Sequence, residues 1–541
     1  MDRRKFLIGS SVAGISLGTI SLAGCKDVKT PETAAPALKD ATEAFELNET
    51  TIDALQDLMK SGKQTSQSIT QMYLDRIGKI DKEGPKLNAV IELNPDALFI
   101  AANMDTERKN GKLRGPLHGI PVLIKDNIDT GDKMQTTAGA LALAGNIAPK
   151  DAFIVSKLRE AGAVLMGKTN LSEWANFRST SSSSGWSSRG GQTKCPYILD
   201  HNPCGSSSGS GAGVAANLCV VAIGSETDGS ITCPASINGL VGIKPTVGLW
   251  SRSGIIPISS TQDTAGPMAR TVRDAAIFLG ALTGFDPIDA VTAESKDKSM
   301  TDYTSFLNVN GLKGKTIGVD LKKKSKNQYI AALLNEAVET LKKLGAIIAD
   351  VEYVDKINAI GKYELEILQY EFKDGVNKYL AGKNIKIKTL KDVIEFNKAN
   401  EDKAMPYFKQ EQLENCEKKK GLESKRYKEA LVKGRDASRK IINDLVTTHK
   451  LDAIAGVTMG PACSIDMAYG DRYGDDSSTQ PAAMAGFPHI SVPMGFVYRL
   501  PVGLSLFGSA YTEGKLISMA YAYEQATKKR VPPTFIKAFL N

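Results

Sequence analysis

Short apolar runs alternate with segments of helical periodicity along almost the whole chain. Residues 154–161 illustrate the helical segments, because apolar side chains recur there every three or four positions. Strands that alternate with helices are typical of a sheet covered on both faces. The pattern therefore predicts an α/β fold, with strands at 122–124, 163–166, 220–223, 452–457, 489–492 and 502–507.

Two helices are predicted where the globular part begins, near Phe45. Thr50 and Asp53 resemble a capping box, and the apolar residues that follow keep helical spacing as far as Gly62. A second run, between Ile69 and Ile80, places its apolar residues on one helical face.

Residues 355–450 are rich in Lys and Glu and predict several helices, which we interpret as an insertion into one large domain, 45–541. Glutamates are interspersed among the basic residues, which is typical of a solvated helical face. The basic residues are Lys418, Lys419, Lys420, Lys425 and Arg426, and the glutamates are Glu411, Glu414, Glu417, Glu423 and Glu429. A net charge of +8 over 541 residues is mild as well, so we expect no nucleic-acid partner.

Residues 1–24 have the composition of an export signal. The pair Arg3–Arg4 precedes an uncharged stretch and resembles a twin-arginine signal, and the residues up to Cys25 resemble a bacterial lipobox. We expect Cys25 to carry a lipid that anchors the exported protein to a membrane of the cell envelope, with residues 25–44 as a tether. A single transmembrane anchor and plain secretion are the alternatives.

Six further cysteines follow the leader, and none of them forms a CxxC pair or a zinc-binding spacing. We therefore expect neither a metal nor a cofactor. A buried apolar role is expected for most of them, while Cys195 and Cys204, the closest pair in the sequence, leave a disulfide open. The six are Cys195, Cys204, Cys219, Cys233, Cys416 and Cys463.

The centre of the chain is rich in Gly and Ser, at 204–213 and again at 224–231. Strong hydrophobic structure follows the first stretch at once, which argues against a flexible linker. The Gly-Lys-Ser/Thr step of a P-loop is absent from this segment. A serine elbow with a histidine base fits poorly too, because only His449 and His489 lie downstream.

A serine hydrolase without a histidine needs another base, and lysine can serve if burial lowers its pKa. Lys125 is the best candidate, because the apolar run 120–124 leads directly into it and would place its amine at the edge of a core. The alternative is a lysine that simply reaches solvent.

Three segments together resemble the motifs of the amidase signature family: Gly119 to Asn127, Gly205 to Ser207, and Thr227 to Ser230. Their order and separations match, and the resemblance extends from about Phe45 to the C-terminus. It implies an α/β/α fold around a large mixed central sheet, with helices on both faces. It also implies an amidase that uses a Ser–cis-Ser–Lys triad.

Within this resemblance, Ser230 matches the nucleophile and Lys125 matches the base. Ser206, 24 residues before the nucleophile, matches the bridging serine, so the Gly205–Ser206 peptide bond is expected to be cis. Ser207 matches a supporting serine. The backbone N–H groups expected to stabilise the oxyanion belong to Thr227, Asp228, Gly229 and Ser230.

Four departures from the commonest family pattern resemble the peptide amidase branch, which removes the C-terminal amide group of peptides and releases ammonia. They are Cys204, Ser208, Asp228 and Thr232. We expect Asp228 to face the substrate and accept a hydrogen bond from its N–H or from the leaving amine.

Three other functions compete with this interpretation. A general amidase for small or fatty amides has the same triad, and so has the A subunit of the tRNA-dependent amidotransferase, although an exported protein would not meet aminoacyl-tRNA. A solute-binding lipoprotein would suit the tether and the α/β pattern, but it has no reason to keep the three motifs in register.

Several conspicuous residues are expected to be structural. His118 would shape the entry to the Lys125 strand, and Asp263 would stabilise a turn or a polar network. The three tryptophans could line a pocket or pack in the core, and the polar loop 471–476 could border the substrate entrance. The tryptophans are Trp174, Trp186 and Trp250.

Overall fold

The computed structural model describes residues 45–323 and 325–540. The expected leader 1–24, the lipidation site Cys25 and the tether 25–44 lie outside these residues. No helix in the described ranges is both long and apolar enough to cross a membrane.

The core of the fold is a sheet of eleven strands, in the order β1-β3-β2-β6-β8-β7-β12-β13-β11-β9-β10. The strands are β1 Val90–Leu93, β2 Pro121–Lys125, β3 Val164–Thr169, β6 Val221–Glu226, β7 Val241–Lys244, β8 Thr264–Ala269, β9 Thr316–Val319, β10 Ile347–Asp350, β11 Ala453–Val457, β12 His489–Val497 and β13 Leu500–Phe507. A separate hairpin pairs β4 (Trp186–Ser187) with β5 (Gly191–Gln192).

The sheet is mixed. Strand β2 is parallel to both of its neighbours, β3 and β6, whereas β8, β7, β12 and β13 are antiparallel to theirs. Two parallel pairs close the far edge, β11 with β9 and β9 with β10. Because β2 and β6 run in the same direction, Lys125 and Glu226, their last residues, lie at the same edge of the sheet.

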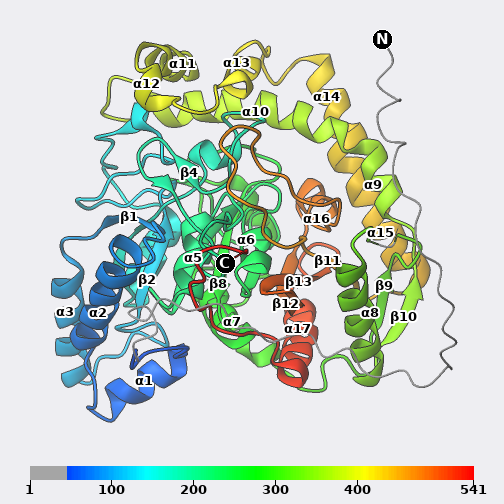
Figure 1. The fold of residues 1–541 in the computed structure, drawn as a ribbon, viewed down its shortest axis with the longest axis horizontal. Coiled ribbons are helices and arrows are strands. Elements are labelled where there is room, and N and C mark those ends of the chain that lie inside the picture. The colour runs from blue at the N-terminus through cyan, green and yellow to red at the C-terminus, as the bar shows by residue number, and fades with distance from the viewer. Residues whose placement is uncertain (1–44, 324, 541) are drawn as a thin grey trace, which may run out of the picture. The chain divides into compact units, whose positions relative to one another are not determined.

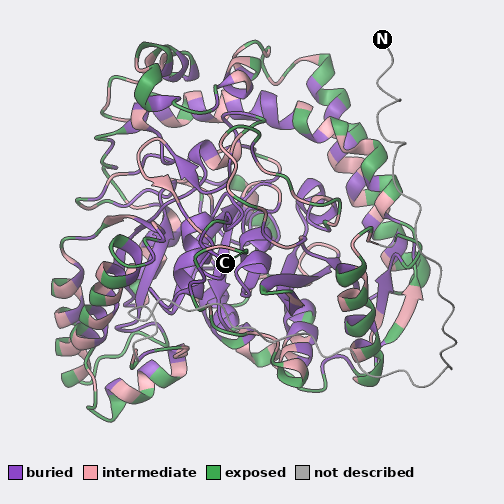
Figure 2. Ribbon diagram, in the orientation of Figure 1, coloured by how far each residue is buried: buried purple, intermediate pink, exposed green. Residues whose placement is uncertain are grey.

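Helices surround this sheet on both faces (Figure 1). They are α1 Ile52–Lys60, α2 Ser66–Arg76, α3 Ala97–Lys109, α4 Phe153–Glu160, α5 Ser208–Ala215, α6 Thr232–Ile237, α7 Val272–Ala281, α8 Gln328–Lys343, α9 Val354–Ile360, α10 Lys362–Ala381, α11 Leu390–Ala399, α12 Glu401–Ala404, α13 Glu411–Glu417, α14 Lys425–Leu431, α15 Ala437–His449, α16 Gln480–Ala485 and α17 Glu513–Thr527. The central strands and helices α5 and α6 are almost wholly buried (Figure 2). The α/β fold with a large mixed sheet is thereby confirmed.

The predicted strands and the first helices are present, with small changes at their ends. Helix α1 is capped by Thr51, whose side chain accepts a hydrogen bond from the Ala54 N–H, so the capping box expected from Thr50 and Asp53 is wrong. The second predicted helix ends as an α-helix at Arg76 and continues as a π-helical turn, Ile77–Lys82.

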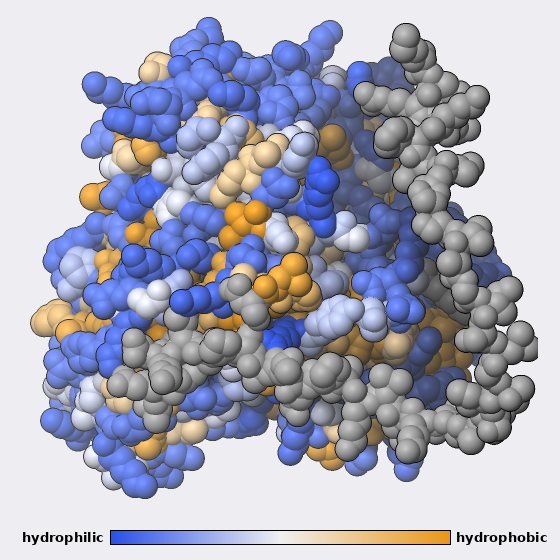
Figure 3. Space-filling model, in the orientation of Figure 1, coloured by the Kyte–Doolittle hydropathy of each residue, from blue (hydrophilic) through white to orange (hydrophobic). Residues whose placement is uncertain are grey.

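The segment predicted as a helical insertion carries helices α9 to α15. Two of its basic residues, Lys419 and Arg426, are paired with one carboxylate, that of Glu366, each at 2.8 Å. The surface over α11 and α13 is mostly hydrophilic (Figure 3). These ion pairs agree with a solvated helical face.

Candidate active site

Lys125 is the last residue of β2 and is fully buried between β3 and β6. Its Nζ lies 2.8 Å from the Ser206 Oγ, 2.9 Å from the Ser225 Oγ and 3.1 Å from the Ser225 carbonyl oxygen. Burial lowers the pKa of Lys125 to about 7, although the charges of Asp263 and Glu226 oppose the shift. The interpretation that this lysine reaches solvent is therefore wrong.

Ser206 lies in the loop that precedes α5, and the Gly205–Ser206 peptide bond is cis, as expected. A glycine is required before it, because a Cβ atom at residue 205 would lie 2.2 Å from the Ser172 Oγ. The Ser206 carbonyl accepts a hydrogen bond from the Ser172 N–H at 3.1 Å. Ser207 supports the loop from behind: its hydroxyl donates to the Ser225 carbonyl on β6 at 3.1 Å.

Ser230 lies in the turn that joins β6 to α6, and Gly229 permits this turn by adopting a φ of +73°. The Ser230 carbonyl accepts a hydrogen bond from the Ser207 N–H at 3.2 Å, which places the turn beside the Ser206 loop. Within the described chain, the Ser230 hydroxyl makes no hydrogen bond to Ser206.

The backbone N–H groups of this turn, Thr227 to Ser230, have no acceptor among the described residues. The next two N–H groups, those of Ile231 and Thr232, differ because both donate to the buried Glu226 carboxylate, at 2.8 and 2.9 Å. Glu226 thus anchors the far side of the turn and leaves the four preceding donors available for a ligand.

Asp263 fixes the near side of the same turn. Its carboxylate accepts a hydrogen bond from the Thr227 hydroxyl at 2.5 Å and from the N–H groups of Ile258 and Ser259 at 2.8 Å. Burial raises the pKa of Asp263 to about 6 despite these hydrogen bonds. The expectation that Asp263 belongs to a polar network is confirmed.

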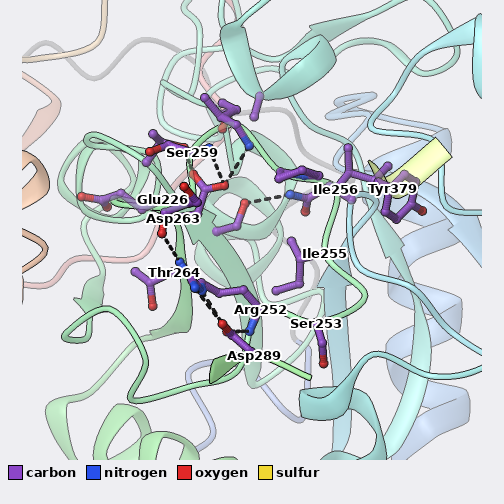
Figure 4. Close-up of a pocket in the computed structure, with 18 of the residues that line it drawn as sticks. Glu226, Arg252, Ser253, Ile255, Ile256, Ser259, Asp263, Thr264, Asp289 and Tyr379 are labelled. Atoms are coloured by element: carbon purple, nitrogen blue, oxygen red, sulfur yellow. Dashed lines mark hydrogen bonds and ion pairs between the residues drawn. The ribbon is translucent and has the colours of Figure 1, made fainter. Parts of the chain in front are cut away.

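A cavity of about 260 Å³ opens beside these groups and is shown in Figure 4. The polar part of its wall includes Ser206 and Thr227, whereas Ser230, in the same turn as Thr227, is not part of the wall. The apolar part of its wall is formed largely by the segment 255–258 and Ile288. The cavity therefore combines a polar end, where the candidate chemistry lies, with an apolar wall.

Two further side chains line the cavity, Arg252 and Tyr379, and the sequence analysis did not identify either of them. Arg252 forms a bidentate ion pair with Asp289, at 2.7 and 2.9 Å, on one side of the cavity (Figure 4). Tyr379 comes from α10 in the helical insertion, and its hydroxyl donates to Asp129 at 2.7 Å. The insertion thus supplies part of the wall.

Asp228, which we expected to face the substrate, is buried near a second acidic residue, Glu364. Its Oδ1 is buried without a hydrogen-bond partner, and burial together with the negative charge of Glu364 raises the pKa of Asp228 well above its usual range. Glu364, also on α10, accepts hydrogen bonds from the amides of Gln262 and Gln480, at 2.8 and 2.7 Å.

Most of the other conspicuous residues are structural. The His118 Nε2 lies 2.9 Å from the Met104 carbonyl oxygen, away from the cavity. Trp250 is fully buried and its Nε1–H donates to the Leu279 carbonyl at 2.8 Å. Asp471 accepts hydrogen bonds from Ser184 and does not line the cavity. Trp174 and Trp186 pack against Phe372 and Phe408 respectively.

The cysteines differ from the sequence prediction in one respect. Cys204 is joined to Cys233 by a disulfide, while Cys195, the nearer cysteine in the sequence, is buried and free. Proximity in the chain was misleading because the turn after Ser230 folds back onto the Ser206 loop. Nowhere in the described ranges do three or more His, Cys, Asp or Glu side chains gather as metal ligands could.

The fold and these loops define a class of enzyme that acts on amides, and comparisons with known proteins agree. The family profile described as Amidase matches residues 68–517. The chain is 42% identical over 507 residues to a probable amidase of Arabidopsis thaliana, covering 92% of this chain and 93% of the relative. It is 36% identical over 473 residues to the A subunit of the glutamyl-tRNA(Gln) amidotransferase of Pseudomonas syringae, covering 86% and 95%.

Among solved structures, the native peptide amidase of Stenotrophomonas maltophilia superposes with a TM-score of 0.85 at 49% identity, over 91% of this chain and all of that one. The chain therefore belongs to the amidase family, and it is an amide-hydrolysing enzyme of the amidase signature type.

Proposed function

We propose that the protein hydrolyses carboxamides with Ser230 as nucleophile, Ser206 as proton relay and Lys125 as base. The observation that carries the proposal is the buried Lys125 amine at 2.8 Å from the Ser206 Oγ. A neutral amine has two N–H donors and one lone pair. If the donors serve the two oxygens of Ser225, the lone pair is left for the Ser206 hydroxyl.

In this mechanism Ser206 passes its proton to Lys125 and takes the proton of Ser230, whose oxygen attacks the amide carbonyl. The resulting oxyanion would be stabilised by the N–H groups of the turn Thr227 to Ser230, which are not engaged elsewhere in the described chain. The proton then returns through Ser206 to the leaving amine, and water hydrolyses the acyl-enzyme.

We propose peptide C-terminal amides as the substrate class, with ammonia as the leaving group. The proposal is supported by the 49% identity to a peptide amidase and by the apolar wall 255–258, which suits the side chain of a terminal residue. A general amidase for small or fatty amides is the second candidate, because the same wall would accept an alkyl chain. The glutamyl-tRNA amidotransferase activity is favoured less, since that relative is only 36% identical.

Ammonia release across a panel of amides tests the substrate class. The panel contains peptide C-terminal amides, free amino-acid amides, aliphatic amides and peptides with internal Asn or Gln. We expect the highest kcat/KM on the peptide amides. Activity confined to aliphatic amides would contradict the peptide amidase proposal and leave the catalytic residues untouched.

Asp228 offers a separate test of substrate positioning. The Asp228 Oδ1 is buried without a hydrogen-bond partner, so this oxygen can accept the hydrogen bond proposed from the substrate amide. We expect Asp228→Ala to lower kcat/KM on primary amides about tenfold, the cost of one hydrogen bond, whereas Asp228→Asn keeps an acceptor and most activity. Unchanged kinetics in Asp228→Ala would contradict this role.

We also propose that the protein is exported and lipid-anchored through Cys25. The proposal rests on residues 1–25 of the sequence alone. Incorporation of a labelled fatty acid in a bacterial host is expected in the full chain and should disappear in Cys25→Ala. Labelling that persists in the variant would place the lipid elsewhere and contradict the lipobox.

A further inference from the structure

The disulfide between Cys204 and Cys233 joins the two loops that carry the candidate serines. Cys204 lies two residues before Ser206, Cys233 lies three residues after Ser230, and their Cα atoms are 6.2 Å apart. No other covalent link connects these loops among the described residues. The disulfide therefore brackets the pair of hydroxyl groups between which the proposed mechanism moves a proton.

The noncovalent links between the two loops are few. One is the hydrogen bond from the Ser207 N–H to the Ser230 carbonyl, 3.2 Å long, and the other joins the Asn238 side chain to the Pro203 carbonyl at 2.9 Å. Asn238 lies at the far end of α6, so it does little to position Ser230. The Ser207 hydroxyl also makes two hydrogen bonds to the Ser225 backbone, but these reach β6 before the turn begins. Without the disulfide, the bond from the Ser207 N–H would be the one hydrogen bond in the described chain that joins the Ser206 loop directly to Ser230.

Hydrogen bonds fix each cysteine within its own loop, so the disulfide can fix the position of one loop relative to the other. Cys204 donates its N–H to the Asn202 side chain at 2.9 Å, and its carbonyl accepts a hydrogen bond from the Ser208 hydroxyl at 2.7 Å. The Cys233 N–H donates to the Gly229 carbonyl at 2.7 Å, within the turn that carries Ser230. Cys204 and Cys233 are 3% and 2% exposed.

We propose that Cys204 and Cys233 are positioning residues, and that their disulfide keeps the Ser206 and Ser230 hydroxyls within proton-transfer distance. This inference rests on the function proposed for the two serines. Neither cysteine lines the cavity, so loss of the disulfide would affect the chemical step rather than substrate binding. A misplacement of about 1 Å between reacting groups can lower a rate about 100-fold.

A consequence follows for the compartment in which the enzyme works. Disulfides persist in oxidising surroundings and are rare in a reducing cytosol. The Cys204–Cys233 disulfide would therefore form in an exported protein. The same chain kept in a reducing cytosol would carry two thiols instead and would hydrolyse its substrate more slowly.

The test replaces both cysteines, in Cys204→Ser/Cys233→Ser, and measures kcat, KM and the rate of fluorophosphonate labelling well below the unfolding temperature. We expect kcat and the labelling rate to fall about 10- to 100-fold, with KM changed less than about threefold. Cys195→Ser is the matched control, because it removes a buried free thiol away from the serines and should leave kcat unchanged.

Reduction of the wild type provides an independent measurement if the double variant folds poorly. A dithiol reductant supplies two electrons and two protons, so the disulfide becomes two thiols while the reductant closes its own disulfide. We expect kcat to fall on reduction and to recover on reoxidation. Mass spectrometry after alkylation would confirm that Cys204 and Cys233 are the residues that change.

Three results would overturn the proposal: wild-type kcat and labelling in the double variant, unchanged kcat after verified reduction, or alkylation of both cysteines in exported protein that was never reduced. Failure of the proposed function looks different. If Ser230→Ala still hydrolyses amides and reacts with the probe at the wild-type rate, the nucleophile is wrong, whatever the cysteine variants do.

Discussion

Ser230→Ala is expected to abolish amide hydrolysis, with kcat reduced about 10⁴-fold or more, because it removes the hydroxyl that we propose forms the acyl-enzyme. Fluorophosphonate labelling should disappear with it. Ammonia release from a peptide amide and gel detection of the labelled protein measure the two effects. The fold should persist, since the Ser230 contact to the Ser207 N–H is made by its main-chain carbonyl.

Ser210→Ala is the matched control for this variant. Ser210 belongs to the same Gly/Ser-rich stretch and is fully buried, but its hydroxyl donates to the Ile223 carbonyl at 2.9 Å and does not line the cavity. We expect Ser210→Ala to lose about 1 kcal/mol of stability and to keep its kcat. A Ser230→Ala variant as active as this control would exclude Ser230 as the nucleophile.

Lys125→Met is expected to lower kcat about 10³-fold or more, because it removes the base and keeps an apolar stem of similar length. In the wild type, kcat/KM should depend on pH with a midpoint near the Lys125 pKa of about 7. The neutral amine is the active form, so the rate rises with pH up to about 7 and is level above it. Below the midpoint it falls about tenfold per pH unit.

Lys168→Met separates catalysis from the general effect of losing a buried lysine. Lys168 lies on β3, is fully buried, and donates to the Ile128 carbonyl at 2.6 Å outside the cavity. We expect this variant to be less stable but to keep the wild-type pH profile of kcat/KM. A flat profile in the wild type between pH 5 and pH 9, measured on an amide without titrating groups, would contradict the lysine base.

The parts of the fold that the sequence predicted share one property: local apolar patterning. The run 120–124 predicted the buried strand that leads into Lys125, whereas the choice of Lys125 and of the two serine loops came from the resemblance to the family motifs. Apolar patterning indicates which side chains are buried on folding, so it predicts strands and the residues that directly adjoin them.

The order of the strands and the walls of the cavity could not be predicted in the same way. Strand β7 pairs with β12, roughly half the chain away, and periodicity contains no information about such partners. Tyr379 and Glu364 approach the site because α10 packs against it, and neither residue lies in a recognisable motif. The Cys204–Cys233 pair was missed for a similar reason, since only the folded turn brings the two together.

Peptide mapping of the fluorophosphonate adduct by mass spectrometry tests the central claim most directly. The probe modifies an activated serine and leaves an ordinary buried hydroxyl unmodified, so the site of the adduct identifies the nucleophile. We expect one adduct, on Ser230, whose rate of formation rises with pH up to about 7, the Lys125 pKa. An adduct on Ser206 or Ser207 instead, or an active wild type that forms none, would contradict it.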